Sequence, residues 1–149
     1  MTKAAEIELL LAEDDPGHAR LIRNKLRDSG ISNNVRHFED GQAILDFLTE
    51  KQNGGDQVDF SHAYLLLLDI RMPKVSGDEV LKRIKSDPVL RLMPVIILTT
   101  TDDPREVRRC HELGCNEYVT KPVDYRAFTD VIRRLGLFLQ IVRVPPLEA

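Results

Sequence analysis

The chain has 149 residues, 42% of them hydrophobic and 30% charged, and 21 lysines and arginines against 24 aspartates and glutamates give a formal net charge of −3. This composition is typical of one globular domain and excludes disordered and collagen-like chains, and no apolar stretch reaches the roughly 20 residues of a membrane-spanning helix. Because the balance is acidic and the N-terminus lacks a signal-peptide pattern, we expect a cytoplasmic domain over residues 1–149 that binds neither nucleic acid nor membrane.

The first half of the chain alternates apolar strands with amphipathic helices. Residues Ile7–Ala12 form a near-continuous apolar run, which predicts a buried strand. Asp15 then suits a helix N-cap with Pro16 at the first helical position, and the helical pattern stops at Ser29-Gly30. The pattern further predicts a strand over residues 34–38, a helix around residues 44–48 and an exposed loop over residues 50–61.

The second half continues the alternation. The run Tyr64–Asp69 is apolar on both faces, as a central parallel strand covered by helices on both sides must be. Further strands are predicted over residues 94–98 and 117–120, with helices around residues 80–84, over residues 104–113 and over residues 124–135. Five strand–helix units predict a doubly wound α/β fold with a five-stranded parallel sheet and five helices, in which ligands bind beyond the carboxyl ends of the strands.

Charged and hydroxyl side chains collect at those carboxyl ends. Glu13 and Asp14 follow the first strand, Asp69 ends the third, Thr99 follows the fourth and Lys121 follows the fifth. Two unit charges 4 Å apart repel by about 4 kcal/mol at an effective dielectric constant near 20, so such a cluster of carboxylates protonates, stays solvated or binds a cation. Oxygen ligands suit Mg²⁺, and a lysine beside them could also contact a phosphoryl oxygen.

Other ligands of α/β folds do not fit this edge. The first turn lacks the G-x-G-x-x-G of a dinucleotide site, no G-x-x-x-x-G-K-[ST] loop is present, and the acids at residues 13–15 would repel the phosphate of a flavin mononucleotide. A haloacid-type aspartyl phosphatase would carry a second aspartate two residues after its nucleophile, where this chain has Arg71. A metal-dependent phosphatase with turnover is therefore disfavoured.

Four segments together resemble a known family. The segments LLAEDDP, LLLLDIRMPKVSG, PVIILTT and EYVTKP occur in this order at predicted strand ends. In this combination the chain resembles the response-regulator receiver domain of two-component signalling from about residue 7 to residue 139. The resemblance implies a flavodoxin-like sheet with strand order 2-1-3-4-5 and a cis peptide bond between Lys121 and Pro122. It also implies a phosphoacceptor that catalyses its own phosphotransfer and autodephosphorylation rather than an enzyme with turnover.

The resemblance implies a role for each residue at the strand ends. Asp69 would accept a phosphoryl group from a sensor histidine kinase, and Mg²⁺ would be held by Glu13, Asp14, Asp69 and the backbone carbonyl of Arg71. Lys121 and the hydroxyl of Thr99 would contact the phosphoryl group, while Thr99 and Tyr118 would form the activation switch. Arg71 and Thr101 occupy the two variable positions that flank the phosphoryl group and tune its lifetime. Glu13 stands where an aspartate is commoner in the family.

The remaining polar residues have simpler interpretations. Asp15 is expected to act only as a helix cap. Cys110 and Cys115 lack the spacing of a zinc site and are expected to be reduced thiols. The histidines are scattered and are expected on the surface rather than as phosphate carriers; they are His18, His37, His62 and His111.

The C-terminal segment contains more apolar residues than one helix face can bury. After Arg134 these residues are Leu135, Leu137, Phe138, Leu139, Ile141, Val142 and Val144. Residues 140–149 are expected to lie outside the core as a tail, which either folds back over the domain or forms a symmetric homodimer with the last helix. No output domain is expected to follow.

These observations favour a small stand-alone regulator, similar in style to those paired with bacterial phytochrome kinases. It would signal by phosphorylation-dependent partner binding, or pass its phosphoryl group to a histidine phosphotransfer protein. The alternative is a phosphorylation-independent adaptor that keeps the receiver fold and acts by docking alone.

Overall fold

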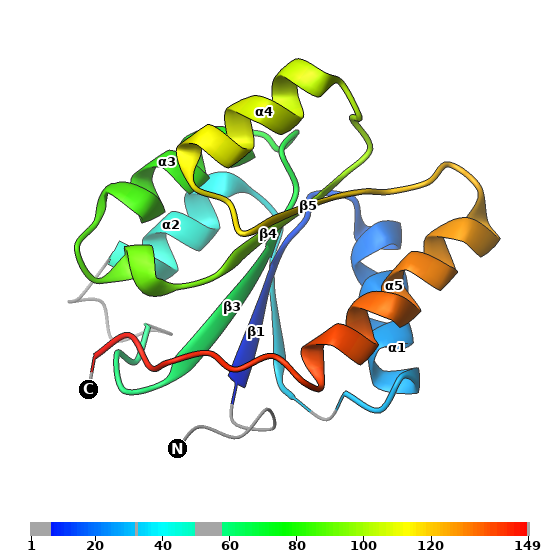
Figure 1. The fold of residues 1–149 in the computed structure, drawn as a ribbon, viewed down its shortest axis with the longest axis horizontal. Coiled ribbons are helices and arrows are strands. Elements are labelled where there is room, and N and C mark those ends of the chain that lie inside the picture. Colours follow the sequence, from blue (N-terminus) through cyan, green and yellow to red (C-terminus); the bar gives the residue numbers. More distant parts are fainter. Residues whose placement is uncertain (1–6, 32, 50–57, 149) are drawn as a thin grey trace.

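The computed structural model describes residues 7–31, 33–49 and 58–148, and in these residues five strands alternate with five α-helices (Figure 1). The strands are β1 (Ile7–Ala12), β2 (Val35–Phe38), β3 (Ala63–Leu68), β4 (Val95–Thr99) and β5 (Glu117–Thr120). The helices are α1 (Pro16–Asp28), α2 (Gly41–Thr49), α3 (Gly77–Ser86), α4 (Pro104–Leu113) and α5 (Tyr125–Leu139), with a short 3₁₀ helix η2 (Leu90–Leu92) before β4.

The strands form one parallel sheet in the order β2-β1-β3-β4-β5, which confirms the predicted fold and strand order. In the register of the sheet, Leu10 of β1 lies opposite Leu66 of β3, and Leu67 lies opposite Ile96 of β4. All neighbouring strands pair in parallel, so the carboxyl ends of β1, β3, β4 and β5 lie at the same edge of the sheet. That edge is where a doubly wound sheet places its ligands.

Successive strand residues point to opposite faces and divide the core into two layers. On one face Leu10, Leu66 and Ile97 pack beneath α2, α3 and α4. On the other face Leu11, Leu67 and their neighbours pack beneath α1 and α5 (Figure 1). This period of two explains why the central runs are apolar throughout: both faces of β1, β3 and β4 are covered.

The predicted cap at Asp15 is confirmed, and α4 has caps at both ends. The Asp15 carboxylate accepts hydrogen bonds from the backbone N–H groups of Gly17 (2.8 Å) and His18 (3.1 Å), and Pro16 is the first residue of α1. Asp103 accepts from the N–H of Arg105 at 2.9 Å before α4. That helix ends at Gly114, whose φ of 105° lies in the left-handed region that favours glycine.

Helix α5 is longer than predicted. The helix was predicted to end at residue 135, yet it continues through Gly136, a residue of low helix propensity, to Leu139. Tertiary packing explains the difference, since a Cβ on Gly136 would lie 2.8 Å from the Cβ of Ser29 at the end of α1. Glycine is therefore required where α5 crosses α1, and burial of Leu135 and Leu139 on either side holds the last turn in place.

The C-terminal tail is part of the core, which corrects the predicted core boundary at residue 139. Val144 and Leu147 are each 3% exposed, and Leu147 joins the layer beneath α2 and α3. The backbone N–H of Leu147 donates to the carbonyl of His62 (3.2 Å), and that of Glu148 donates to the carbonyl of Phe60 (2.7 Å). The tail thus runs from the end of α5 across the amino edge of the sheet (Figure 1).

Three smaller expectations have separate outcomes. Of the predicted loop at residues 50–61, residues 50–57 lie outside the described residues, while Val58 and Phe60 pack against the core. The Lys121–Pro122 bond is trans rather than cis, the isomer that is lower in energy by about 0.5–1 kcal/mol before proline. Across the described ranges, no helix combines the length and the apolar character needed to cross a membrane.

Candidate functional site

The buried polar and charged side chains of the described residues all lie at the carboxyl edge of the sheet. They are Glu13, Asp69, Thr99 and Lys121, with exposed fractions between 0% and 7%. Each is the last residue of a strand or the first residue after one, as the sequence predicted. Burying charge is costly unless the charges are paired, so this edge is held together by contacts among these side chains.

Asp69 is fixed by the backbone on both sides of the turn after β3. Its N–H donates to the carbonyl of Ala12 (3.0 Å), and its Oδ1 accepts from the N–H of Ile70 (2.7 Å). The N–H of Gly77 donates to the carbonyl of Ile70 at 2.7 Å. A Cβ on Gly77 would lie 2.0 Å from the carbonyl oxygen of Asp69, so only glycine lets α3 begin this close to the carboxylate. The second oxygen, Oδ2, faces Lys121.

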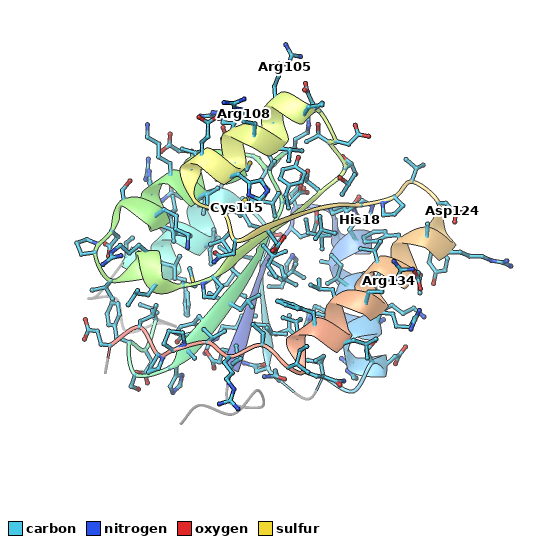
Figure 2. All side chains as sticks on the ribbon, viewed as in Figure 1. His18, Arg105, Arg108, Cys115, Asp124 and Arg134 are labelled. Atoms are coloured by element: carbon cyan, nitrogen blue, oxygen red, sulfur yellow. The ribbon has the colours of Figure 1, made fainter. Side chains whose placement is uncertain are left out.

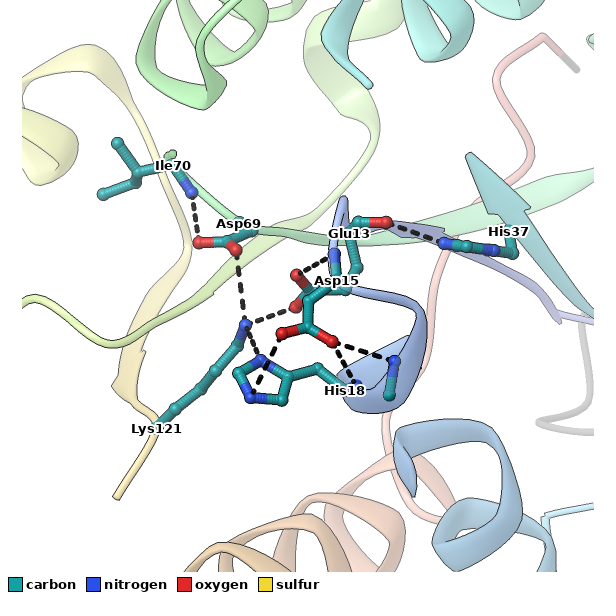
Figure 3. Close-up of polar contacts among 8 residues, drawn as sticks. Glu13, Asp15, His18, His37, Asp69, Ile70 and Lys121 are labelled. Atoms are coloured by element: carbon teal, nitrogen blue, oxygen red, sulfur yellow. Dashed lines mark hydrogen bonds and ion pairs between the residues drawn. The ribbon is translucent and has the colours of Figure 1, made fainter. Parts of the chain in front are cut away.

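The Lys121 ammonium contacts side chains from the end of β1, the end of β3 and the first turn of α1 (Figure 3). Its Nζ forms a short ion pair with Oε1 of Glu13 and lies 3.3 Å from Oδ2 of Asp69. It also lies 3.2 Å from Nδ1 of His18. The Lys121 backbone N–H donates to the carbonyl of Thr99 at 2.6 Å, which fixes the start of the loop after β5. One buried cation therefore links two carboxylates at the ends of different strands.

Glu13 is the most strongly perturbed acid of this edge. Burial raises its pKa from 4.5 to about 7, although the Lys121 hydrogen bond and charge act in the opposite direction. Its Oε2 accepts from the N–H of Asp15 (3.2 Å), and its backbone carbonyl lies 2.7 Å from Nε2 of His37. Glu13 thus has a defined place at the end of β1. Its side chain pairs with Lys121.

Three carboxylates are close enough to hold one metal ion. One oxygen each from Glu13, Asp14 and Asp69 lies within 4.8 Å of the other two, with Asp14 exposed and the other two buried. The set carries three potential negative charges against the single positive charge of Lys121, so a cation is electrostatically favoured there. Carboxylate oxygens are hard ligands of the type that divalent ions such as Mg²⁺ prefer, so these residues fit the predicted metal.

Thr99 and Tyr118 lie on neighbouring strands beside this cluster. The Thr99 hydroxyl is completely buried and has no hydrogen-bond partner within the described residues. A buried hydroxyl without a partner is uncommon, and here it lies at the end of β4 beside the acidic edge. Tyr118 on β5 is half-buried, and its hydroxyl donates to the backbone carbonyl of Thr101 at 2.7 Å. Burial raises the pKa of Tyr118 to about 12, which keeps this donor protonated.

Arg71 and Thr101 lie in the loops that follow β3 and β4, two residues beyond Asp69 and Thr99. Arg71 is exposed, and within the described ranges it makes no ion pair. Thr101 is half-buried and reaches Tyr118 through its backbone carbonyl rather than through its hydroxyl. The residue therefore connects the loop after β4 to β5.

One residue of the site was missed from the sequence. His18 was expected on the surface, but its side chain is only 36% exposed and lies between α1 and the loop that leads into α5 (Figure 2). Its ring packs edge-on against Phe128 of α5, with centroids 5.4 Å apart and an interplanar angle of 89°. The sequence places His18 in the first turn of α1, but only the fold brings that turn against Lys121 and α5.

The two cysteines are unrelated to this site. Both are free and buried, and Cys115 lies where the chain returns from α4 to β5 (Figure 2). Burial raises the pKa of Cys110 to about 12 and also raises that of Cys115, so both remain protonated thiols near neutral pH. Reduced thiols were predicted, and the structure confirms them.

Comparison with known proteins decides the family. The sequence profile of the response regulator receiver domain matches residues 9–133. The chain belongs to the response regulator receiver family. Response regulator Rcp1 from Synechocystis is 33% identical over 138 residues, which are 92% of this chain and 92% of that protein.

Solved receiver structures agree with the fold. A response regulator receiver domain from Rhodospirillum rubrum is 44% identical, with a TM-score of 0.88, over 95% of this receiver and 99% of that chain. The Mn²⁺-bound form of Rcp1 gives a TM-score of 0.83 at 30% identity, over 94% and 99% of the two chains. The bacteriophytochrome response regulator RtBRR gives 0.71 at 36% identity, over 98% and 85%.

Proposed function

We propose that this receiver accepts a phosphoryl group from a sensor histidine kinase on Oδ2 or Oδ1 of Asp69 and changes its partner contacts as a result. The observation that carries the proposal is the contact between Asp69 and Lys121 inside a cluster of three carboxylates. A nucleophilic carboxylate beside a fixed ammonium and a cation site is what transfer of a phosphoryl group to oxygen requires.

The transfer exchanges one bond to phosphorus for another. The P–N bond of a kinase phosphohistidine breaks as an Asp69 oxygen forms a P–O bond, and the imidazole leaves with the electron pair and takes up a proton. Asp69 is already oriented by the N–H of Ile70, so little reorganisation precedes attack. Lys121, 3.3 Å from Oδ2, stands where it can turn from the carboxylate to a phosphoryl oxygen.

A divalent ion completes the charge balance. Glu13, Asp14 and Asp69 would hold Mg²⁺ together with the backbone carbonyl of Arg71, and the ion supplies positive charge that offsets both the carboxylates and the incoming phosphoryl group. The Mn²⁺-bound form of the relative Rcp1 supports a divalent ion for this site.

The unpartnered Thr99 hydroxyl supplies the switch. A phosphoryl group on Asp69 would offer it an acceptor oxygen, and movement of Thr99 changes the loop that carries Thr101. Because the Tyr118 hydroxyl is bound to the Thr101 carbonyl, that movement reaches β5 and the face formed with α5. A local change in charge would thus alter a binding surface.

Phosphorylation with a small acyl phosphate tests the proposal without the kinase. We expect about one phosphoryl group per chain with Mg²⁺, none with a chelator, and none in Asp69→Asn. Asp28→Asn, an exposed aspartate at the end of α1, is the matched control and should be labelled like the wild type. Undiminished labelling of Asp69→Asn would disprove the assignment.

The same experiment separates two other candidate functions. A phosphorylation-independent adaptor would not be labelled, although it would still bind its partner. A phosphatase would release many equivalents of phosphate per chain, whereas a receiver that dephosphorylates itself releases about one equivalent for each one bound. Arg71, which stands where a haloacid-type phosphatase carries a second aspartate, favours the receiver over the phosphatase.

The identity of the kinase is a finer proposal. The similarity to Rcp1 and to the bacteriophytochrome response regulator RtBRR along nearly the whole chain supports a bacterial phytochrome kinase as the donor, in the cytoplasm, for a stand-alone regulator. A histidine phosphotransfer protein is a further acceptor from Asp69. Phosphate transfer from a panel of purified histidine kinases would identify the donor by the fastest labelling.

A homodimer through α5 completes the proposal. Leu137, Phe138 and Ile141 remain 50%, 42% and 77% exposed, and Phe138 lines a groove of about 430 Å³ between β5 and α5. The groove is lined mainly by apolar side chains, which include Val119, Val131 and Leu135. An exposed phenylalanine at an apolar groove suits a two-fold contact in which each copy packs Phe138 against the groove of the other.

Point substitutions are the right test of the dimer. Deletion of residues 137–149 would remove the buried Leu139, Val144 and Leu147 and so disturb the core. Phe138→Glu and Ile141→Glu should instead give folded monomers that still accept phosphate. A wild type that sediments as a monomer at tens of micromolar, with and without phosphorylation, would rule out the dimer.

A further inference from the structure

We propose that His18 is a positioning residue for the phosphoryl transfer: its neutral imidazole holds the Lys121 ammonium at the mouth of the site without cancelling the charge of that ammonium. The inference rests on the proposed function, since it concerns the lysine that contacts the phosphoryl group. It starts from one contact, in which Lys121 Nζ lies 3.2 Å from Nδ1 of His18.

The contact fixes the roles of both ring nitrogens. An ammonium has three N–H donors and no acceptor, so Nδ1 of His18 must be the acceptor and a neutral ring must carry its proton on Nε2. That nitrogen faces Oδ2 of Asp15 at 3.8 Å, where a carboxylate favours the protonated nitrogen. Asp15 is therefore more than a helix cap, because it caps α1 and faces the ring of His18 at the same time.

The ring is held on further sides, so its position is set by the fold. The backbone N–H of His18 donates to the Asp15 cap, and the edge of the ring packs against Phe128, which is 4% exposed on α5. These contacts come from α1 and α5, while Lys121 comes from the loop between β5 and α5. His18 thus ties the cation to the two helices on one side of the sheet.

The chemistry of the three Lys121 contacts explains why a neutral ring is suited to this place. Two N–H groups face the carboxylates of Glu13 and Asp69, and charge-assisted bonds of this kind are about twice as strong as neutral ones. A third carboxylate in place of His18 would compete with a phosphoryl group for the ammonium. A neutral acceptor directs the ammonium toward Asp69 and leaves its positive charge available for the phosphoryl oxygen.

Two substitutions of His18 separate its role as a hydrogen-bond acceptor from the packing of its ring against Phe128. His18→Phe keeps an aromatic ring against Phe128 and removes the acceptor, whereas His18→Asn removes the ring and keeps an amide oxygen at the position of Nδ1. With a small acyl phosphate and Mg²⁺, we expect labelling of Asp69 to slow about fivefold in His18→Phe, the factor that corresponds to one hydrogen bond, and to stay within about twofold of the wild type in His18→Asn. His111→Phe, an exposed histidine on α4, controls for the change of residue type.

A second measurement does not depend on labelling. In a ¹⁵N spectrum of the imidazole rings of the metal-free protein above pH 7.5, His18 should show only the tautomer with the proton on Nε2, while exposed His111 should show the mixture of a free imidazole. Full-rate labelling of His18→Phe, or equal slowing of both His18 variants, would overturn the proposal. Should the wild type fail to accept phosphate, the proposed function is wrong, and a His18 ring with the same mixture as His111 would also refute the Lys121 contact.

Discussion

A lysine lies at each edge of the sheet, and different chemistry holds each one. At the amino edge, Lys85 donates to the backbone carbonyls of Met93 (2.7 Å) and Arg91 (3.1 Å) and approaches Oδ1 of Asn116 (3.4 Å). At the carboxyl edge, Lys121 is held by Glu13, Asp69 and His18. The carbonyl and amide oxygens around Lys85 are neither protonated nor phosphorylated near neutral pH, whereas the carboxylates around Lys121 can be. The ammonium group of Lys85 therefore has a structural role only, whereas that of Lys121 can exchange a carboxylate partner for a phosphoryl oxygen.

The tail strengthens this contrast. The amino edge is closed by residues 142–148, which bury Val144 and Leu147 against the two layers of the core. The carboxyl edge instead leaves Asp14 exposed and the Thr99 hydroxyl without a partner in the part of the chain that the structure describes. Substitutions at the amino edge should accordingly change stability alone, whereas those at the carboxyl edge should also change metal binding or phosphorylation.

The largest effect is expected at the amino edge. Leu147→Ala removes a side chain that is 3% exposed, so the free energy of unfolding should fall by about 2–4 kcal/mol. Ile141→Ala in the same tail removes a side chain that is 77% exposed and should stay within about 0.5 kcal/mol. Urea denaturation measures both, and labelling of Asp69 in the folded variants should be unchanged. Equal losses in the two variants would show that the tail does not close the core.

The next effect is the pH dependence of stability that Glu13 causes at the carboxyl edge. Because burial raises the folded-state pKa of Glu13 from 4.5 to about 7, the folded chain holds this proton more tightly than the unfolded chain. The resulting stabilisation is complete below about pH 4.5 and is lost as the pH rises through about 7. In metal-free buffer, the stability of the wild type relative to Glu13→Gln should therefore fall by on the order of 2 kcal/mol from pH 5 to pH 8.

Leu147→Ala is the matched control, since it changes the opposite edge of the sheet without removing a titratable group. This variant should keep the pH dependence of the wild type. A Glu13→Gln variant whose stability follows the wild type at every pH would contradict the assignment of the shift to Glu13.

The lysine of the amino edge should have a smaller, purely structural effect. Lys85→Met removes the donor for the carbonyls of Arg91 and Met93, which should cost about 1–2 kcal/mol of folding free energy. Thermal or urea unfolding measures this loss. Phosphate labelling should proceed at the wild-type rate, and a slowed reaction would mean that the two edges are coupled through β4.

The smallest effect is expected for the lifetime of the phosphoryl group. Arg71 is exposed beside the site, and as a cation it can pair with a phosphoryl oxygen and hinder an attacking water. Exposed ion pairs contribute less than about 1 kcal/mol, so Arg71→Asn should shorten the half-life of phospho-Asp69 by only about two- to threefold. Decay of the label after removal of the donor measures it, and an unchanged half-life would place the arginine side chain away from the phosphoryl group.

The sequence predicted the fold and the acidic edge well because both depend on local signals. The apolar runs at β1 and β3 placed those strands to within a residue, the cap residue Asp15 placed the start of α1, and the range predicted for α4 matches the observed one. Parallel strands bring their carboxyl ends together by topology alone. Glu13, Asp69 and Lys121 could therefore be grouped before any distance was known.

The features that were missed depend on where elements meet in space. The spacing of α1 indicates an amphipathic helix but not that its first turn faces Phe128 and Lys121, so His18 was expected on the surface. The apolar residues after residue 139 showed that something must be buried, but not that Val144 and Leu147 would be buried in their own domain. The length of α5 depended on the contact between Gly136 and Ser29, which no local pattern contains.

The placement of Leu147 also has a consequence for the order in which the domain can form during synthesis. The layer beneath α2 and α3 is built almost entirely from residues 10–115, yet it contains this one leucine from beyond α5. A ribosome that makes the chain from its N-terminus completes those helices well before residue 147 emerges. Until then the nascent domain leaves an apolar slot open at its amino edge, where a chaperone could bind or another nascent chain could aggregate. A released chain that ends before residue 147 should therefore be open at its amino edge, although every residue of its phosphorylation site is present.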